Sequence, residues 1–437
     1  MSTGYIYVKQ SPPLEGTVHL DGAKNAVLAI MASLLLTSGK SILRNVPALS
    51  DVDQMIKILQ SLGAIIVFDK EQNQLEVDTT NIQSDFLVQD CVKRFRASFL
   101  ILGPLLVRCK KVLLAMPGGD DIGVRPLDYH IKNFIKMGAS ISYEDNLLSA
   151  AAKQLSATKI VLDYPSVGAT ENLMMALTLV PGRSCIINAA LEPEVLDLIK
   201  VLKKMGAGIK IVAPAMIIID GITTLKPIDH TIIPDRLEAG SILIAGALTG
   251  GDISIPDVVI GDMDLFLMKL EEMGHHISYG KNGKGVRIQG IKNAKAVSFK
   301  TAPYPGLATD LQPMLMAAQI VAQGTSNIIE TVFENRFLHV PELRKMGAMV
   351  EATGHFAKVT GVEQLYGASV VATDIRASCC LALIGLVAQG ETFIDGLSHW
   401  KRGYETFDKK LRTLGAFIEL REEMIMPLTL SGVEKVV

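Results

Sequence analysis

Residue types that often carry disulfide or metal chemistry are scarce in this chain of 437 residues. It has five cysteines and no CxxC pair, so we expect neither a disulfide framework nor a cysteine-rich zinc site. It also lacks an HExxH pattern and any other His/Cys cluster, so no bound metal or cofactor is predicted. The cysteines are expected to be reduced, which favours a cytoplasmic location.

Aromatic residues are few, and neither charge is in excess. Aromatics make up 5% of the chain, with one tryptophan, which disfavours a base-stacking platform. Lys and Arg number 43 against 45 Asp and Glu, a formal net charge of −2. This balance excludes a broad basic surface, so no nucleic-acid partner is expected.

Long hydrophobic runs are missing too. The longest uncharged stretch, 311–329, contains three glutamines and an asparagine. The purely apolar runs are shorter than the roughly 20 residues that a bilayer requires. The first ten residues lack the basic and apolar segments of a signal peptide. No membrane partner is therefore expected, and the positive mean hydropathy predicts a large buried core.

A short signature recurs six times, consisting of a bulky apolar residue, a glycine and usually an alanine. Its glycines are Gly63, Gly138, Gly206, Gly274, Gly347 and Gly415. Subtracting neighbouring glycine numbers gives 75, 68, 68, 73 and 68. Each copy follows an amphipathic run and precedes an alternating one. The glycine is therefore predicted to end a helix with positive φ before a strand begins.

A second predicted helix lies roughly midway between these signatures. Its six copies, at 27–36, 99–107, 173–180, 241–248, 313–321 and 381–387, are apolar around nearly the whole cylinder, which is typical of helices buried on all sides. We predict an α/β fold of six units, grouped as two domains that each pack three buried helices inside outer sheets. A single α/β solenoid is the alternative. The proline-containing stretch 225–238 is the candidate crossing between domains.

Polar residues gather at the starts of these buried helices. They are Lys24, Asn25, Arg94, Arg96, the segment 166–170, Arg236, Asp310, Asp374 and Arg376. Helix N-termini attract anions, so the repetition predicts an anionic small-molecule ligand in the interdomain cleft. Each residue by itself is more typical of a solvated or ion-paired surface position, and only the repetition favours a functional role.

The segment 116–126 combines glycines with charge. Gly118, Gly119 and Gly123 permit unusual backbone angles, and Asp120, Asp121 and Arg125 lie among them. We predict a closing lid, with an ordinary surface turn as the alternative. It is not a P-loop, because no GKS or GKT follows.

Essentially from end to end, the chain resembles the UDP-N-acetylglucosamine 1-carboxyvinyltransferase family of enolpyruvyl transferases. The resemblance rests on the segments 22–26, 43–47, 95–98, 117–119, 123–126, 166–170, 308–312, 333–337, 374–378 and 402–405. It implies a two-domain inside-out α/β barrel with three units of about 70 residues per domain. The first domain is expected at 22–233 with the lid, and the second at 1–21 plus 234–437.

The resemblance also implies a reaction: the enolpyruvyl group of phosphoenolpyruvate passes to the 3′-hydroxyl of UDP-N-acetylglucosamine, and phosphate leaves. This addition–elimination is the first committed step of peptidoglycan synthesis. The expected partners are these two substrates, and no oligomeric state is predicted.

The resemblance assigns the site residue by residue. Phosphoenolpyruvate is expected on Lys24, Asn25, Arg125 and Arg402. UDP-N-acetylglucosamine is expected on Arg96, Arg125, Pro126, Leu127, Asp128, Tyr129, Tyr164, Pro165, Ser166, Val167, Asp310 and Val332. Asp120 and Asp310 are the candidate proton donor and acceptor, with Lys24 and Arg402 also catalytic. Asp374 and Arg376 are supporting residues.

Two positions depart from the family pattern. Asp120 occupies the lid position that most members fill with cysteine, and Tyr164 stands where many have lysine. A carboxylate is a poorer nucleophile than a thiolate, so we expect resistance to fosfomycin, which alkylates the lid thiol. Tyr164 supplies no charge, which leaves nucleotide affinity open.

Two other functions remain alternatives. One is a catalytically silent paralogue that binds a UDP-sugar. The other is 5-enolpyruvylshikimate-3-phosphate synthase, whose Asn-Ala-Gly-Thr-Ala-x-Arg motif is absent here. His130, next to the nucleotide segment, either contacts substrate or is a core residue.

Overall fold

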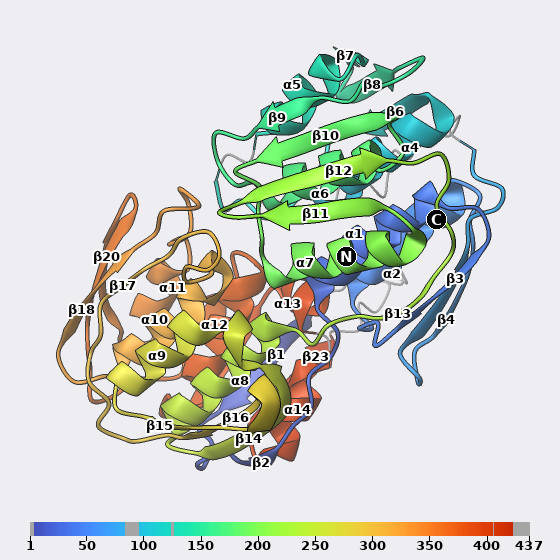
Figure 1. Cartoon of the computed structure of the whole chain (residues 1–437). Coiled ribbons are helices and arrows are strands. Elements are labelled where there is room, and N and C mark those ends of the chain that lie inside the picture. The colour runs from blue at the N-terminus through green and yellow to red at the C-terminus, as the bar shows by residue number, and fades with distance from the viewer. Residues whose placement is uncertain (1–3, 84–95, 124–125, 405, 423–437) are drawn as a thin grey trace, which may run out of the picture.

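The structure, a computed structural model, describes residues 4–83, 96–123, 126–404 and 406–422. Within these ranges the chain forms six small sheets that lie outside groups of helices (Figure 1). The number of sheets is consistent with the six predicted units.

Three sheets are built from the first half of the chain. The first has the order β13 (Asp229–Thr231), β3 (Lys40–Arg44), β5 (Gln74–Asp78) and β4 (Ile65–Asp69). The second has the order β6 (Lys111–Ala115), β8 (Leu147–Ala151) and β7 (Ser140–Glu144). The third has the order β11 (Gly208–Val212), β12 (Met216–Gly221), β10 (Gly182–Ile187) and β9 (Lys159–Val161).

The other three sheets are built from the second half of the chain, and two of them include a strand from the N-terminus. Their orders are β15 (His276–Tyr279), β16 (Lys284–Gln289), β14 (Asp252–Val259) and β2 (Glu15–Thr17); β17 (Phe299–Lys300), β18 (Thr325–Ile329), β20 (Phe356–Thr360) and β19 (Met349–Thr353); and β21 (Ser369–Val371), β22 (Glu391–Asp395), β1 (Gly4–Lys9) and β23 (Phe417–Glu422). β1 runs antiparallel to both neighbours, with Tyr7 opposite Phe393 and Glu419. The N-terminal strand thus fills the interior of a sheet made by the C-terminus.

The helices inside the sheets are those predicted to have no solvent face. They are α1 (Lys24–Ser33), α4 (Leu102–Cys109), α6 (Val167–Leu177), α8 (Arg236–Thr249), α10 (Gln312–Ile320) and α12 (Ile375–Gly385). Every residue of α10 and α12 is buried. This burial accounts for the high hydropathy, since no face of these helices needs polar side chains.

The remaining helices pack with one face toward solvent. They are α2 (Ser50–Ser61), α5 (Asp128–Lys136), α7 (Pro193–Met205), α9 (Asp264–Glu272), α11 (Val340–Lys345), α13 (Leu397–Gly403) and α14 (Phe407–Thr413). The six signature glycines follow six of them with φ between 95° and 114°. The predicted left-handed helix ends are therefore confirmed.

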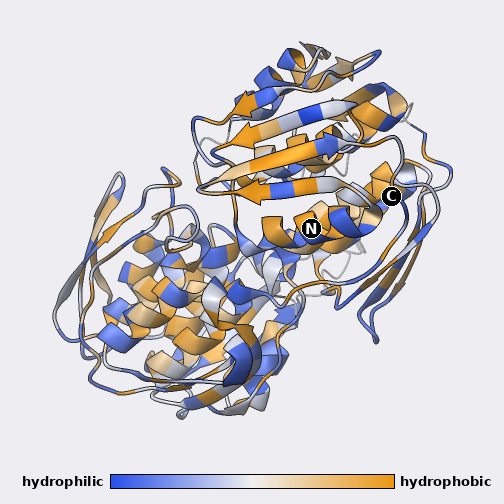
Figure 2. Cartoon of the chain, viewed as in Figure 1, coloured by the Kyte–Doolittle hydropathy of each residue, from blue (hydrophilic) through white to orange (hydrophobic). Residues whose placement is uncertain are grey.

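Two hydrophobic cores are present. One contains residues between Ala23 and Ile232, and the other contains Ile6 to Leu20 together with Leu237 to Ile418. Hydrophobic residues concentrate in the helices and strands of both cores (Figure 2). The chain passes between the cores twice, at adjacent segments where Ala23 N–H donates to Ile233 and Asp235 N–H donates to Asp21. No described helix is long and apolar enough to cross a membrane.

Candidate active site

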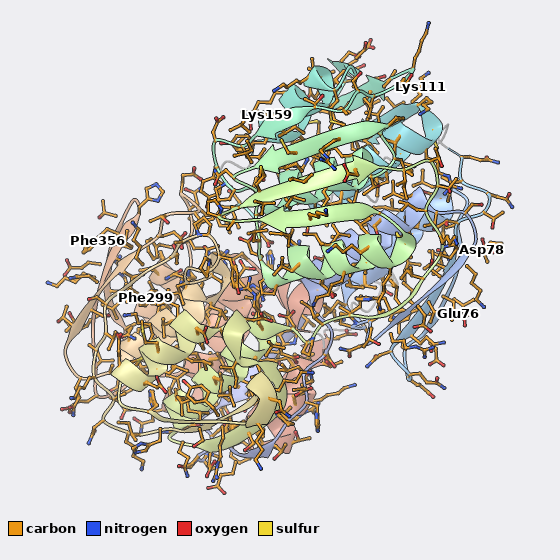
Figure 3. The ribbon with its side chains drawn as sticks, viewed as in Figure 1. Glu76, Asp78, Lys111, Lys159, Phe299 and Phe356 are labelled. Carbon is orange, nitrogen blue, oxygen red and sulfur yellow. The ribbon has the colours of Figure 1, made fainter. Side chains whose placement is uncertain are left out.

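A cavity of about 620 Å³ is lined by residues from both cores. It holds eleven of the predicted substrate-binding residues: Asn25, Arg96, Pro126, Leu127, Tyr129, Tyr164, Pro165, Ser166, Val167, Asp310 and Val332. The cavity therefore brings together residues as far apart in the sequence as Asn25 and Val332. Charged side chains on the outer sheets, such as Lys111 and Lys159 labelled in Figure 3, do not line it.

A second hollow of about 560 Å³ shares Arg96, Pro126 and Leu127 with this cavity. It is also lined by Asp128, the remaining predicted nucleotide contact that the structure describes. Arg96 lies in a 3₁₀ helix (Arg96–Ile101) and donates to the carbonyl of Pro126 at 3.2 Å. The predicted Arg125 lies outside the described residues.

The segment before α6 forms one wall of the main cavity. Ser166 caps the helix, its hydroxyl accepting from the N–H of Ala169 at 3.3 Å, as its residue type favours. Burial raises the pKa of the neighbouring Tyr164 to about 12, helped by Glu192 and Glu330. Tyr164 is therefore neutral and offers a hydroxyl where a lysine would offer charge.

Lys24 and Arg402 meet at a carboxylate that the sequence did not single out. Lys24, at the start of α1, places Nζ 3.4 Å from Oδ2 of Asp51. Arg402, on α13, donates from Nε to Oδ1 of Asp51 at 2.9 Å. Asp51 lies in the first turn of α2 and is 4% exposed. It holds together two cations from different cores.

Arg402 also reaches the lid. Its terminal nitrogen donates to Oδ1 of Asp120 at 2.6 Å, and Nδ1 of His399 lies 3.5 Å from the same oxygen. The lid backbone is attached as well, since Asn335 N–H donates to the carbonyl of Ile122 at 3.0 Å. The lid of the first core thus lies against the second core through Asp120 and Ile122.

Opposing effects act on the Asp120 carboxyl. Burial by itself would raise its pKa, but the imidazole of His399 and the charges of Arg402 and Lys24 lower it to about 2. Asp121, the neighbour considered as a cause of a raised pKa, is exposed and does not produce one. In this arrangement Asp120 is ionised at neutral pH.

Asp310 is held between two arginines. It lies in a 3₁₀ helix (Thr309–Leu311), where Arg336 donates to Oδ1 at 2.8 Å and Arg376 to Oδ2 at 2.9 Å. Burial would raise its pKa, but the charges of Arg376 and Arg336 hold the pKa well below its usual range. Asp310 is an ionised carboxylate that faces the cavity.

The two predicted supporting residues lie at the start of α12, where Asp374 caps the helix and Arg376 contacts other side chains. Asp374 caps α12 by accepting from the N–H groups of Arg376 and Ala377 at 2.8 and 3.1 Å. The cap fixes the first turn, so the Arg376 guanidinium reaches both Asp310 and the hydroxyl of Tyr404, 2.7 Å away.

Another part of the cavity lining is acidic. Glu171, Glu192 and Glu194 line it, and Arg236 pairs with Glu194 through two bonds of 2.9 and 3.1 Å. Burial, reinforced by Glu194 and Glu192, raises the pKa of Glu171 well above its usual range. This wall carries neutral or paired groups, in contrast to the cationic end.

His130 lines the cavity and is also buried against other side chains. Its Nδ1 lies 3.2 Å from the amide of Asn172, and its ring packs edge-on against Phe99. Burial, with a smaller contribution from Arg96, lowers its pKa to about 3. His130 is therefore a neutral side chain that lines the cavity and also packs among buried residues.

Five further residues of this region had no predicted role: Asp51, Glu171, Glu192, Arg336 and His399. His399 lies one helical turn before Arg402, a spacing that indicates a shared helix face. Arg336 lies within the motif 333–337, which had been noticed without a role. The two glutamates carried no sequence signal beyond their type. No cluster of metal-ligating residues occurs in the described ranges.

Comparison with known proteins identifies the class of protein to which the fold belongs. Residues 8–411 match the family model described as EPSP synthase (3-phosphoshikimate 1-carboxyvinyltransferase). Among solved structures, the enolpyruvyl transferase NikO from Streptomyces tendae superposes with a TM-score of 0.88 at 24% identity, covering 97% of this chain and all of that one. EPSP synthase from Acinetobacter baumannii gives 0.75 at 17% identity, covering 96% and all. The fold is that of the enolpyruvyl transferases.

Sequence relatives narrow the class. The chain is 47% identical over 418 residues to UDP-N-acetylglucosamine 1-carboxyvinyltransferase 1 of Caldanaerobacter subterraneus subsp. tengcongensis, covering 96% of this chain and 99% of the relative. It is 46% identical over 409 residues to UDP-N-acetylglucosamine 1-carboxyvinyltransferase of Thermodesulfovibrio yellowstonii, covering 93% and 97%. The chain belongs to the UDP-N-acetylglucosamine 1-carboxyvinyltransferase family.

Proposed function

We propose that this protein transfers the enolpyruvyl group of phosphoenolpyruvate to the 3′-hydroxyl of UDP-N-acetylglucosamine and releases phosphate, as the first committed step of peptidoglycan synthesis. The observation that carries the proposal is the cluster of Lys24, Arg402 and Asp120 beside a cavity lined by Asp310. Cations for a small polyanion, a lid carboxyl and a second carboxylate are the groups this reaction requires.

The proposal includes a division of the chain. Residues 22–233 form one domain, with the lid at 116–126, and residues 1–21 plus 234–437 form the other. The two cores and the paired crossings at Asp21–Ala23 and Ile233–Asp235 support it. Each domain holds three repeats in an inside-out barrel, and the substrates bind between the domains.

Phosphoenolpyruvate binds at the cationic end. Asp51 already orients Lys24 and Arg402, so less conformational freedom is lost when these cations bind the substrate. Asn25 is exposed at the cavity, and Arg125 completes the set by resemblance alone. The carboxylate and phosphate of the substrate replace part of the negative charge that Asp51 and Asp120 now supply to these cations.

UDP-N-acetylglucosamine occupies the main cavity and the adjoining hollow. Arg96, Pro126, Leu127, Asp128 and Tyr129 face one end, the segment 164–167 faces the diphosphate, and Asp310 and Val332 face the sugar. The N-terminus of α6 offers backbone N–H groups to a phosphate, which compensates for the missing charge at Tyr164.

Asp120 is the general acid in place of the family's cysteine. It gives a proton to the methylene carbon of phosphoenolpyruvate while the sugar hydroxyl attacks the neighbouring carbon. The cations that now lower its pKa are the ones the substrate neutralises, so substrate binding raises that pKa. In the elimination step the carboxylate takes a proton back from the same carbon and phosphate leaves.

Asp310 accepts the proton of the attacking hydroxyl. Its two arginines keep it ionised and fix both oxygens, although they also weaken its basicity. The transfer is needed only as the carbon–oxygen bond forms, when the hydroxyl becomes strongly acidic. No cofactor takes part in the proposed reaction.

A phosphate-release assay tests the proposal. Release with UDP-N-acetylglucosamine, and none with shikimate 3-phosphate, is the expected outcome. Release with shikimate 3-phosphate only would identify the sister activity named by the family model. Binding of UDP-N-acetylglucosamine without any release would instead identify a silent paralogue. The paired Lys24, Arg402 and Asp120 support the active enzyme, because binding of a UDP-sugar alone requires no lid acid.

We propose a cytoplasmic location as well. Cys185, Cys379 and Cys380 are free thiols. Reduced thiols suit the compartment that supplies both proposed substrates.

A further inference from the structure

His399 occupies a position that the reaction as proposed does not explain. It lies on the first turn of α13, three residues before Arg402, with its Nδ1 3.5 Å from Oδ1 of Asp120. That nitrogen is shielded from solvent and has no closer polar partner among the described side chains. The distance is the outer limit of a hydrogen bond, so a movement of a few tenths of an ångström completes the contact.

Asp120 as it stands has no proton to give. Arg402 bonds to the same oxygen at 2.6 Å, and the carboxyl is ionised at neutral pH. An acid step therefore requires a nearby group that brings a proton to this oxygen. Among the charged side chains of the cluster, Lys24 and Arg402 are already bonded to Asp51.

Histidine is the residue type that gains and loses a proton in the physiological range. His399 faces Asp120, which is also bonded to Arg402 from the same helix as His399. Arg402 in turn connects this pair to Asp51 of α2 and, through Asp51, to Lys24 of α1. The proposed binding of phosphoenolpyruvate adds negative charge beside the cations of this cluster.

We infer that His399 is the positioning residue of Asp120 and the source of its proton. Resting on the proposed function, the inference extends it by one transfer. The N–H bond at Nδ1 breaks and its electron pair stays on the imidazole, while an O–H bond forms at Oδ1 of Asp120. That O–H bond then breaks as the π electrons of the vinyl group form a C–H bond. In the elimination step one of the three methyl C–H bonds breaks, its proton passes to Oδ1 of Asp120 and on to Nδ1 of His399, and its electron pair re-forms the vinyl group as the C–O bond to phosphate breaks and phosphate leaves.

The test is the substitution His399→Asn, which keeps a hydrogen-bond donor near Nδ1 and removes the titrating proton. We expect kcat to fall about 100-fold while KM for phosphoenolpyruvate changes less than about threefold. The wild-type rate is expected to decline toward alkaline pH, and the variant profile is expected to lack this decline, because asparagine has no ring proton to lose.

A matched control is present in the chain. His19 places Nδ1 3.5 Å from Oδ2 of Asp257, the same separation, but its side chain is 75% exposed and lines neither cavity. His19→Asn is expected to leave kcat and the pH profile unchanged. Thermal midpoints and UDP-N-acetylglucosamine binding, measured on both variants, show whether each protein is folded.

Deuterium uptake separates failure of this inference from failure of the proposed acid. In heavy water with both substrates, wild type is expected to place deuterium on the methylene carbon, and His399→Asn to do so about 100-fold more slowly. If His399→Asn keeps the wild-type kcat and pH decline while Asp120→Asn takes up no deuterium, His399 is not the proton source and the Asp120 role stands. If Asp120→Asn takes up deuterium at the wild-type rate, both proposals are overturned.

Discussion

The two carboxylates of the site, Asp120 and Asp310, are both ionised and both bonded to arginine, but they are held in different ways. Asp310 belongs to a helical turn and gives each oxygen to a separate buried arginine, Arg336 or Arg376, which are 2% and 6% exposed. Asp120 belongs to a glycine-rich loop and shares one oxygen between Arg402 and His399.

The difference lies in what the partners do besides holding the carboxylate. Arg376 is also bonded to Tyr404, and Arg336 to the backbone of Thr309, so both belong to the second core. Arg402 instead connects the lid to Asp51 across the cores and is a proposed ligand of phosphoenolpyruvate. Asp310 is therefore held by the second core, whereas we expect the surroundings of Asp120 to change when substrate binds.

The largest expected effect is that of Asp120→Asn. The amide keeps the shape and a contact to Arg402 but cannot exchange a proton, so we expect kcat for phosphate release to fall at least 10³-fold. UDP-N-acetylglucosamine binding, measured by calorimetry, is expected to stay within about threefold, because Asp120 does not line the main cavity. Turnover near the wild-type rate would remove Asp120 from the acid role.

For the stability of the fold, losing an arginine partner of Asp310 is expected to cost more than losing the arginine partner of Asp120. Arg376→Met leaves a buried carboxylate and the Tyr404 hydroxyl short of a partner, a loss on the order of 3 kcal/mol. Arg402→Met removes a guanidinium that is 20% exposed, with Lys24 still beside Asp51, a loss of about 1 kcal/mol. Thermal midpoints are expected to fall by roughly 8 °C and roughly 2 °C. Equal shifts would contradict the idea that Asp310 is held by the fold and Asp120 by the ligand site.

The repeat carried most of what the sequence revealed about the fold. Gly63 and its five equivalents end surface helices at positive φ, and the helices between them have no polar face, so periodicity alone predicted six units. The strand exchange was beyond that reasoning. β1 joins β22 and β23 through backbone hydrogen bonds, which any strand-forming sequence offers, and only the family resemblance had placed it there.

The candidate site divides in a similar way. Lys24, Arg96 and Asp310 were predictable because they begin buried helices, where the backbone attracts charge. Asp51 was not, since its function depends on Arg402 reaching it from 351 positions away. His399 was missed for the same reason. Its partner Asp120 lies on a loop whose closure against α13 follows from tertiary packing, and no local pattern specifies it.

The smallest effect is expected for fosfomycin on the wild-type protein. The drug alkylates the lid thiol in the family, and a carboxylate held by Arg402 is a weak nucleophile, so we expect no time-dependent loss of activity in the wild type. Asp120→Cys places a thiol beside Arg402 and Lys24, cations that favour the thiolate. We expect inactivation of this variant at least about 100-fold faster than of wild type, with a drug adduct on the lid peptide by mass spectrometry. Asp310→Cys is the matched control, because a thiol between two fixed arginines lies outside the lid and is expected to stay unmodified. An adduct on wild-type Asp120 would show that its carboxylate is more reactive than its ion pair allows.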